Sequence, residues 1–105
     1  MTTKQLATIE KRIRRIKDSL QSIREMRPGS LTQQSHDPEK RRVYWQLSYT
    51  YKMRSRSEYI RDQFVKDTQR QIKNYKRFRS LVDEWLALAI EHARLKMSSA
   101  LGKKR

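Results

Sequence analysis

Apolar residues at the start of the chain recur with the period of an α-helix. Steps of three and four residues separate them, at Leu6, Ile9, Ile13, Ile16, Leu20 and Ile23. This spacing lines them up along one stripe of a helix, while Lys and Arg fill most other positions. Thr2 or Thr3 can cap the helix, and Pro28-Gly29 is expected to terminate it. The pattern predicts a helix over residues 2–26.

The period changes to alternation beyond a polar connector at residues 27–42. In residues 43–51 one side of an extended chain would carry Val43, Trp45, Leu47, Tyr49 and Tyr51. A basic turn around Lys52-Met53-Arg54 leads to a second extended run that ends at Ile60. We therefore predict a β-hairpin over residues 43–60, although its turn lacks the Gly or Asn typical of tight hairpins.

A long helical pattern runs from residue 62 to residue 98. Its stripe comprises Phe64, Thr68, Ile72, Tyr75, Phe78, Leu81, Val82, Trp85, Leu88, His92 and Leu95. A basic tail follows at residues 99–105. The predicted fold is a single domain over residues 1–105, mainly α. It is an antiparallel, coiled-coil-like helical hairpin with a small β-hairpin inserted between a shorter N-terminal and a long C-terminal helix.

The unequal lengths of the two helices predict self-association. At about 1.5 Å per residue they span roughly 36 and 55 Å. The first helix would then cover the second only to about Trp85, leaving an apolar overhang. We expect a homodimer whose interface consists of Trp85, Leu88, Ala89, His92 and Leu95.

The charge of the chain points to a polyanionic partner. Twenty-six Lys and Arg stand against eleven Asp and Glu, for a net charge of +15. Residues 40–79 hold thirteen of the bases and only three acids, whereas residues 80–101 hold two bases and three acids. Such an excess is relieved when nucleic acid neutralises it. The distribution predicts a basic end that binds and a neutral end that associates.

The candidate contacts lie on the hairpin and on the first half of the second helix. They are Arg41, Arg42, Tyr44, Lys52, Arg54, Arg56, Lys66, Arg70, Lys73 and Arg77. Arg54 and Arg56 are the strongest candidates for phosphate contact, and Tyr44 and Tyr51 are the aromatic residues expected to face outward. The alternative is that the helical row is merely a solvated face and that the hairpin aromatics form core.

Residues suited to catalysis or metal binding are sparse. The chain has no cysteine, its two histidines, His36 and His92, fall on different elements, and it has only two glycines. No metal site, cofactor or enzymatic activity is therefore expected. No export signal or membrane span is apparent, and we expect a cytoplasmic protein.

Three functional hypotheses follow from these features. The first is a non-catalytic nucleic-acid-binding protein. DNA is favoured over RNA because a long basic helix and a ribbon suit a duplex. The second is a helical adaptor or accessory subunit that binds another protein through its coiled-coil seam. The third is a peripheral membrane binder that uses the basic first helix.

Several motifs resemble those of a family of small prokaryotic proteins that carry a domain of unknown function. They are the segments Arg27-Pro28-Gly29-Ser30-Leu31, Tyr44-Trp45-Gln46-Leu47-Ser48-Tyr49-Thr50, Arg56-Ser57-Glu58-Tyr59-Ile60 and Asn74-Tyr75-Lys76-Arg77-Phe78-Arg79-Ser80-Leu81. The resemblance implies the order helix, hairpin, long helix. Many members hold a cysteine cluster suggestive of zinc, but the matching interval here, residues 32–43, has no cysteine. The hairpin glycine usual in the family is replaced near Met53.

Overall fold

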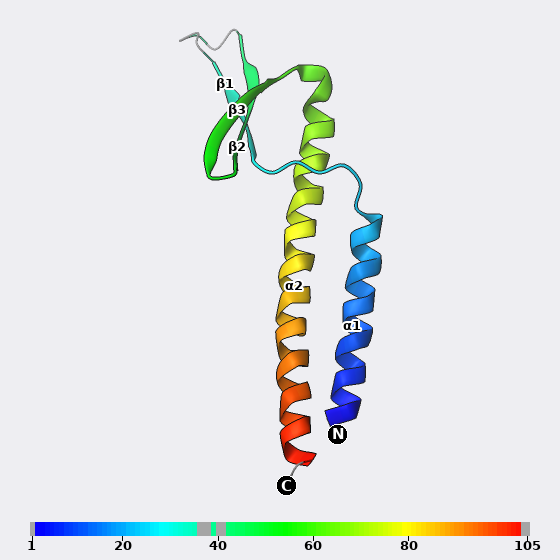
Figure 1. Cartoon of the computed structure of the whole chain (residues 1–105). Coiled ribbons are helices and arrows are strands. Elements are labelled where there is room, and N and C mark those ends of the chain that lie inside the picture. Colours follow the sequence, from blue (N-terminus) through cyan, green and yellow to red (C-terminus); the bar gives the residue numbers. More distant parts are fainter. Residues whose placement is uncertain (1, 36–38, 40–41, 104–105) are drawn as a thin grey trace. The chain divides into compact units, whose positions relative to one another are not determined.

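A computed structural model describes residues 2–35, 39 and 42–103. Its elements are, in chain order, α1 (Thr2–Ser22), β1 (Ser30–Gln34), β2 (Tyr44–Tyr51), β3 (Arg54–Ile60), a 3-10 turn η1 (Asp62–Phe64) and α2 (Val65–Lys103) (Figure 1). They form two compact units. The sheet unit is Arg24–Arg77, and the helical-pair unit is Met1–Ile23 with Phe78–Arg105.

The sheet unit contains a three-stranded antiparallel sheet in the order β1-β2-β3. The predicted fold class, a mainly α helical hairpin with only a two-stranded insertion, is therefore wrong. Strand β1 falls within the segment expected to be a polar connector. Leu31 is its one apolar residue, so the sequence lacks the alternation that indicates a strand. Pairing of Leu31 with Leu47 places that residue at the core. The order of first helix, hairpin and long helix is confirmed.

One face of the sheet packs on the start of α2. Leu47 is fully buried there, in a cluster with Ile60, Val65 and Ile72. Leu31, Trp45 and Tyr49 pack against this cluster and are partly buried. These are the alternate residues of β2 and their cross-strand neighbours. The predicted alternation is therefore confirmed for Trp45, Leu47 and Tyr49, which lie on one face and pack in the core. Val43 and Tyr51, at the two ends of the same series, are exposed.

The hairpin turn consists of Lys52 and Met53, because Tyr51 pairs with Arg54. Both turn residues have left-handed backbone angles, with φ of 51° and 65°. A two-residue hairpin loop requires this conformation to match the twist of its strands. The predicted hairpin is thus confirmed, and it forms without the expected Gly or Asn.

Gly29 sets the entry into β1. Its φ is 120°, and a Cβ atom at this position would lie 2.5 Å from the Ser48 carbonyl oxygen and 2.9 Å from the Tyr49 Cβ. Glycine is therefore required twice here, by backbone angle and by the close approach of β2.

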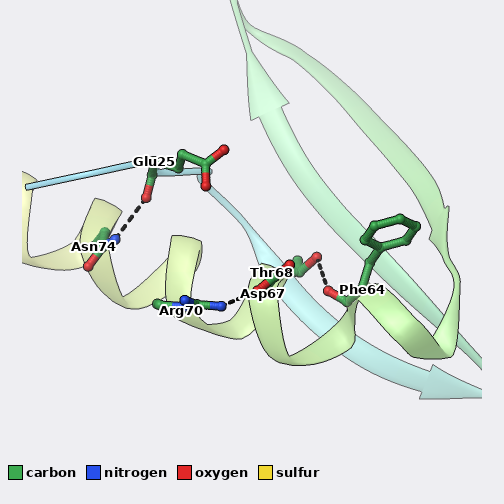
Figure 2. Close-up of polar contacts among 6 residues, drawn as sticks. All are labelled: Glu25, Phe64, Asp67, Thr68, Arg70 and Asn74. Carbon is green, nitrogen blue, oxygen red and sulfur yellow. Dashed lines mark hydrogen bonds and ion pairs between the residues drawn. The ribbon is translucent and has the colours of Figure 1, made fainter.

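Helix α1 ends at Ser22, four residues before the predicted end. Within the sheet unit, the chain that follows bonds to α2 instead of continuing as helix. The side-chain amide of Asn74 donates to the Glu25 carbonyl oxygen at 2.8 Å (Figure 2). The backbone N–H of Arg27 donates to the Gln71 carbonyl oxygen at 3.1 Å. These bonds satisfy backbone groups that helix would otherwise use.

In the helical-pair unit, α1 runs antiparallel to the later part of α2 (Figure 1). Ile9, Ile16 and Leu88 form its buried centre. Side chains from both helices flank this centre, namely Ile13, Leu20, Leu81, Trp85 and Leu95. The Arg12 and Glu84 side chains lie 3.9 Å apart, and the Lys17 Nζ lies 5.2 Å from the centroid of the Trp85 ring.

The prediction that α1 covers α2 only as far as Trp85 is wrong. Leu88 is only 5% exposed, and Leu95 packs against the same cluster. Of the five residues assigned to a dimer interface, Leu88 is buried, whereas Trp85, Ala89, His92 and Leu95 are partly buried. Helix α1 ends earlier than predicted, but the part of α2 that it covers is not reduced, because Ile9 of this cluster lies in the N-terminal turns of α1.

In the described part of the chain, no helix is long and apolar enough to span a membrane.

Candidate nucleic-acid interface

A basic cleft in the sheet unit lies between the first turns of α2 and the chain that enters β1. It has a volume of about 660 Å³. Its α2 wall carries Lys66, Gln69, Arg70, Ile72, Lys73 and Lys76, and its other wall is Gly29-Ser30-Leu31. Four of these nine residues are cationic and none is acidic. All four cationic side chains are exposed. We call this feature the basic cleft.

The helical spacing of the cations explains the basic cleft. Lys66, Arg70 and Lys73 follow at steps of four and three, which places them on one side of α2. These three are brought together as the sequence indicated, although their role in binding stays a prediction. Arg77 continues the same steps but does not line the cleft, whereas Lys76 does. Lys76 lies three residues after Lys73, so the helical period alone fits either residue.

The polar side chains in and beside the basic cleft differ in whether they already have a partner. The Arg70 guanidinium pairs with the Asp67 carboxylate (Figure 2), and both side chains are more than half exposed. Such surface pairs contribute little free energy, so replacing this one by a contact with a phosphate would cost little. Lys66, Lys73 and Lys76 form no ion pair with any residue in the described part of the chain. The Thr68 hydroxyl is buried and donates to the Phe64 carbonyl oxygen at 2.8 Å, so it is occupied within the helix.

The hairpin cations lie apart from the basic cleft. Arg54 and Arg56 are exposed on β3, the edge strand opposite β1. They pair with Tyr51 and Tyr49, which places them on the face of the sheet that packs on α2. Lys52, in the turn, has its Nζ 5.4 Å from the centroid of the Tyr51 ring. Arg42 is exposed just before β2, and Arg41 lies outside the described residues.

Tyr44 lies on the other face of the sheet and is partly buried. Its ring centroid is 6.0 Å from that of Tyr59, and the ring planes are inclined at 45°. Tyr59 is 63% exposed. Tyr59 was not among the predicted contact residues, although the alternation of β3 places it on the face opposite to that of the inward Ile60. Tyr51, expected to face outward, is exposed but belongs to the α2-facing set.

The charge does not divide the molecule into a basic and a neutral end. The sheet unit has fourteen Lys and Arg against six Asp and Glu, and the helical-pair unit has twelve against five. The nearly neutral stretch of residues 80–101 packs against α1, whose stripe of isoleucines is surrounded by Lys and Arg. What distinguishes the sheet unit is the convergence of cations on one cleft.

The histidines and acids form no metal-binding group among the described residues. The His92 Nε2 lies 3.1 Å from the Glu10 carboxylate across the helical pair. His36, expected to be a surface residue, lies outside the described residues.

Comparison of the chain with known proteins identifies a family. No curated protein and no solved structure matches the chain significantly. One family model does match, over residues 6–70, from the first helix through the hairpin to the first turns of α2. That stretch is more than half of the chain. The protein therefore belongs to the family defined by the domain of unknown function DUF6788.

Proposed function

We propose that this protein is a non-catalytic nucleic-acid-binding protein that contacts phosphates through its basic cleft. The observation that carries the proposal is the position of Lys66, Lys73 and Lys76. All three are exposed, line one cleft and have no acidic partner among the described residues. Like charges at helical spacing repel one another. An anion bound between them removes that repulsion.

A polyanion satisfies this site better than a single small anion does. The residues of the sheet unit carry an excess of eight positive charges, among them Arg54 and Arg56 on the far edge strand. A nucleic-acid backbone presents a phosphate at every nucleotide, and each contact releases condensed counterions. Arg54 and Arg56 are proposed as additional backbone contacts, separate from those of the cleft.

The preference for duplex DNA loses one of its two supports. It depended on the long basic helix and on a free two-stranded ribbon that could enter the major groove. Strand β2 is instead the central strand of a sheet, between β1 and β3, and one face of that sheet packs on α2. We therefore propose binding to nucleic acid of either kind, and the experiment compares DNA with RNA.

We further propose that a second copy of the chain covers an apolar stripe on α2. The stripe consists of Leu86, Ile90 and Met97, which are 58%, 46% and 62% exposed. Steps of four and seven place them on one side of the helix, distinct from the buried Leu88. This stripe replaces the residues first assigned to the dimer. A partner protein that binds the same stripe is the alternative. The adaptor hypothesis had instead placed such a partner on the coiled-coil seam, whose residues Ile9 and Ile16 pack against Leu88.

Direct titration tests the proposed function. Labelled duplex DNA, single-stranded DNA and single-stranded RNA are titrated with the full chain at several salt concentrations. With about six phosphate contacts, the logarithm of affinity should fall against that of salt with a slope of about −5 on duplex and about −4 on single strands. Absence of binding to all three probes at low salt overturns the proposal. Binding to anionic vesicles alone assigns the charge to a membrane surface.

A further inference from the structure

The outer face of the sheet, turned away from α2, is polar and uncharged. Cross-strand partners share a face, so the residues alternating with the inward set of Trp45, Leu47 and Tyr49 define it. The ten residues are Ser30, Thr32, Gln34, Tyr44, Gln46, Ser48, Thr50, Ser55, Ser57 and Tyr59. None is charged, in a chain in which 35% of residues are. An ordinary solvated face of this protein would carry several charges.

The strand register arranges this face in rows. One row runs Thr32, Gln46, Tyr59 across the three strands, and another runs Ser30, Ser48, Ser57. Tyr59 is directly opposite Gln46 and diagonal to Tyr44, whose ring it approaches to 6.0 Å between centroids. Diagonal aromatic neighbours can support one another in this way. The Tyr59 ring thus has the Tyr44 ring on one side, and the residue is 63% exposed.

Cations stand at the end of the face where the tyrosines lie. Arg42 precedes Tyr44 by two residues, and Arg61 follows Tyr59 by two residues. Both arginines are exposed. The start of β2 and the end of β3 are neighbours, since Trp45 pairs with Ile60. An exposed ring, neutral hydrogen-bonding side chains and flanking guanidinium groups therefore occur together at this end of the sheet.

We propose that this face binds single-stranded nucleic acid by stacking an unpaired base on Tyr59. The inference rests on the proposed function and names its substrate class. A nucleobase offers a flat π-face for the ring and polar edges for Gln46 and the hydroxyl groups, and its phosphates suit Arg42 and Arg61. In a duplex the bases are already stacked and paired, so their faces cannot reach the sheet. Sequence preference is not required, because every base has a π-face.

The test separates bases from backbone. Fluorescence anisotropy compares a labelled deoxythymidine oligomer with an abasic deoxyribose-phosphate oligomer of the same length, and with a uridine oligomer. The deoxythymidine oligomer should bind about tenfold more tightly than the abasic one. Tyr59→Ala should remove about tenfold of that affinity and leave abasic binding unchanged. Tyr59→Phe should retain the stacking.

Tyr51→Ala is the matched control, because Tyr51 is a comparably exposed tyrosine of the same hairpin on the opposite face. It should bind both oligomers as the unmodified protein does, and circular dichroism should confirm that each variant is folded. Equal affinity for the two oligomers, or Tyr59→Ala without effect, overturns the stacking inference and leaves the phosphate-contact function standing. Failure to bind any oligomer at low salt overturns both. Tyr59-dependent binding of a neutral oligosaccharide alone would assign the face to carbohydrate.

Discussion

The Arg27 guanidinium bridges both carboxylate oxygens of Glu58, one of them at 3.5 Å, and so joins the chain that enters β1 to strand β3. The same guanidinium lies over the Tyr49 ring, 5.5 Å from its centroid. Because the Arg27 backbone also bonds to Gln71 of α2, this one residue connects the basic cleft's entrance chain with both the sheet and the helix. The geometry of the cleft wall depends on this residue.

The pair makes the stability of the sheet unit depend on pH. Hydrogen bonding to Arg27 lowers the pKa of Glu58 below its ordinary value, and the Arg27 charge and a hydrogen bond with Tyr49 act in the same direction against desolvation. A lowered folded-state pKa gives stability that is present above the unfolded value, about 4.3 for Glu, and lost as pH falls through the folded value.

We therefore predict that Glu58→Gln lowers the free energy of unfolding at pH 7 by at most about 1 kcal/mol, because the pair is partly exposed. The difference from the unmodified protein should shrink as pH falls below about 4. Urea unfolding at several pH values measures it. Asp83→Asn, which removes an exposed acid from the other unit, is the control. A difference in unfolding free energy that persists undiminished at low pH would contradict the attribution of the effect to the Arg27–Glu58 pair.

Met53→Gly should stabilise the hairpin. Met53 has a left-handed backbone and a side chain that is 97% exposed, so little packing is lost. Relief of the left-handed strain contributes about 1–2 kcal/mol, and the extra freedom of Gly in the unfolded chain subtracts about 0.4–1 kcal/mol. A net gain of roughly 0.5–1 kcal/mol is expected by urea unfolding. Ser57→Gly, within β3, should instead destabilise, and a loss at Met53→Gly would refute the turn geometry.

Leu47→Ala should have the largest single effect on the sheet unit. Leu47 is fully buried at the centre of the cluster with Ile60, Val65 and Ile72. Removing its side chain leaves a cavity and should cost about 2–5 kcal/mol. The exposed Val43 of the same unit provides the control, since Val43→Ala should change stability by less than about 0.5 kcal/mol. Similar costs at the two positions would be incompatible with the described core.

Ile90→Glu tests the proposed self-association. The substitution places a charge in the exposed stripe of Leu86, Ile90 and Met97 and leaves the buried Leu88 in place. The molecular mass in solution, measured by light scattering, should fall from dimer to monomer with helicity retained. Leu88→Glu is expected to disrupt the helical pair itself, so it does not address the interface. A dimer that persists in Ile90→Glu rules out the stripe as the dimer interface.

Periodicity predicted both helices and the hairpin because each has a strong local pattern. Leu6 to Ile23 and Leu81 to Leu95 carry regular apolar steps, and Trp45, Leu47 and Tyr49 alternate. Strand β1 was missed because only Leu31 is apolar and its pairing with β2 spans a long polar segment. The end of α1 was misplaced because tertiary hydrogen bonds to Asn74 and Gln71 compete with the helix.

The candidate site was only partly accessible to sequence reasoning. Helical spacing gathered Lys66, Arg70 and Lys73, but the opposing wall at Gly29 is set by the sheet, and Lys76 lines the cleft in place of Arg77. Alternation along residues 43–51 correctly separated Tyr44, Gln46, Ser48 and Thr50 from the face that carries Trp45, Leu47 and Tyr49. The extension of the outer face to β1 and to Tyr59 required the register.

The salt dependence of binding in a charge-matched pair of variants tests the phosphate contacts most directly. Lys66→Gln with Lys73→Gln removes two cations from the basic cleft, and Lys4→Gln with Lys11→Gln removes two exposed cations from α1. On a single-stranded oligomer, the cleft variant should reduce the slope of log affinity against log salt by about 1.4, whereas the α1 variant should leave it unchanged. Equal slopes for the two variants would contradict the proposal that the basic cleft contacts phosphates.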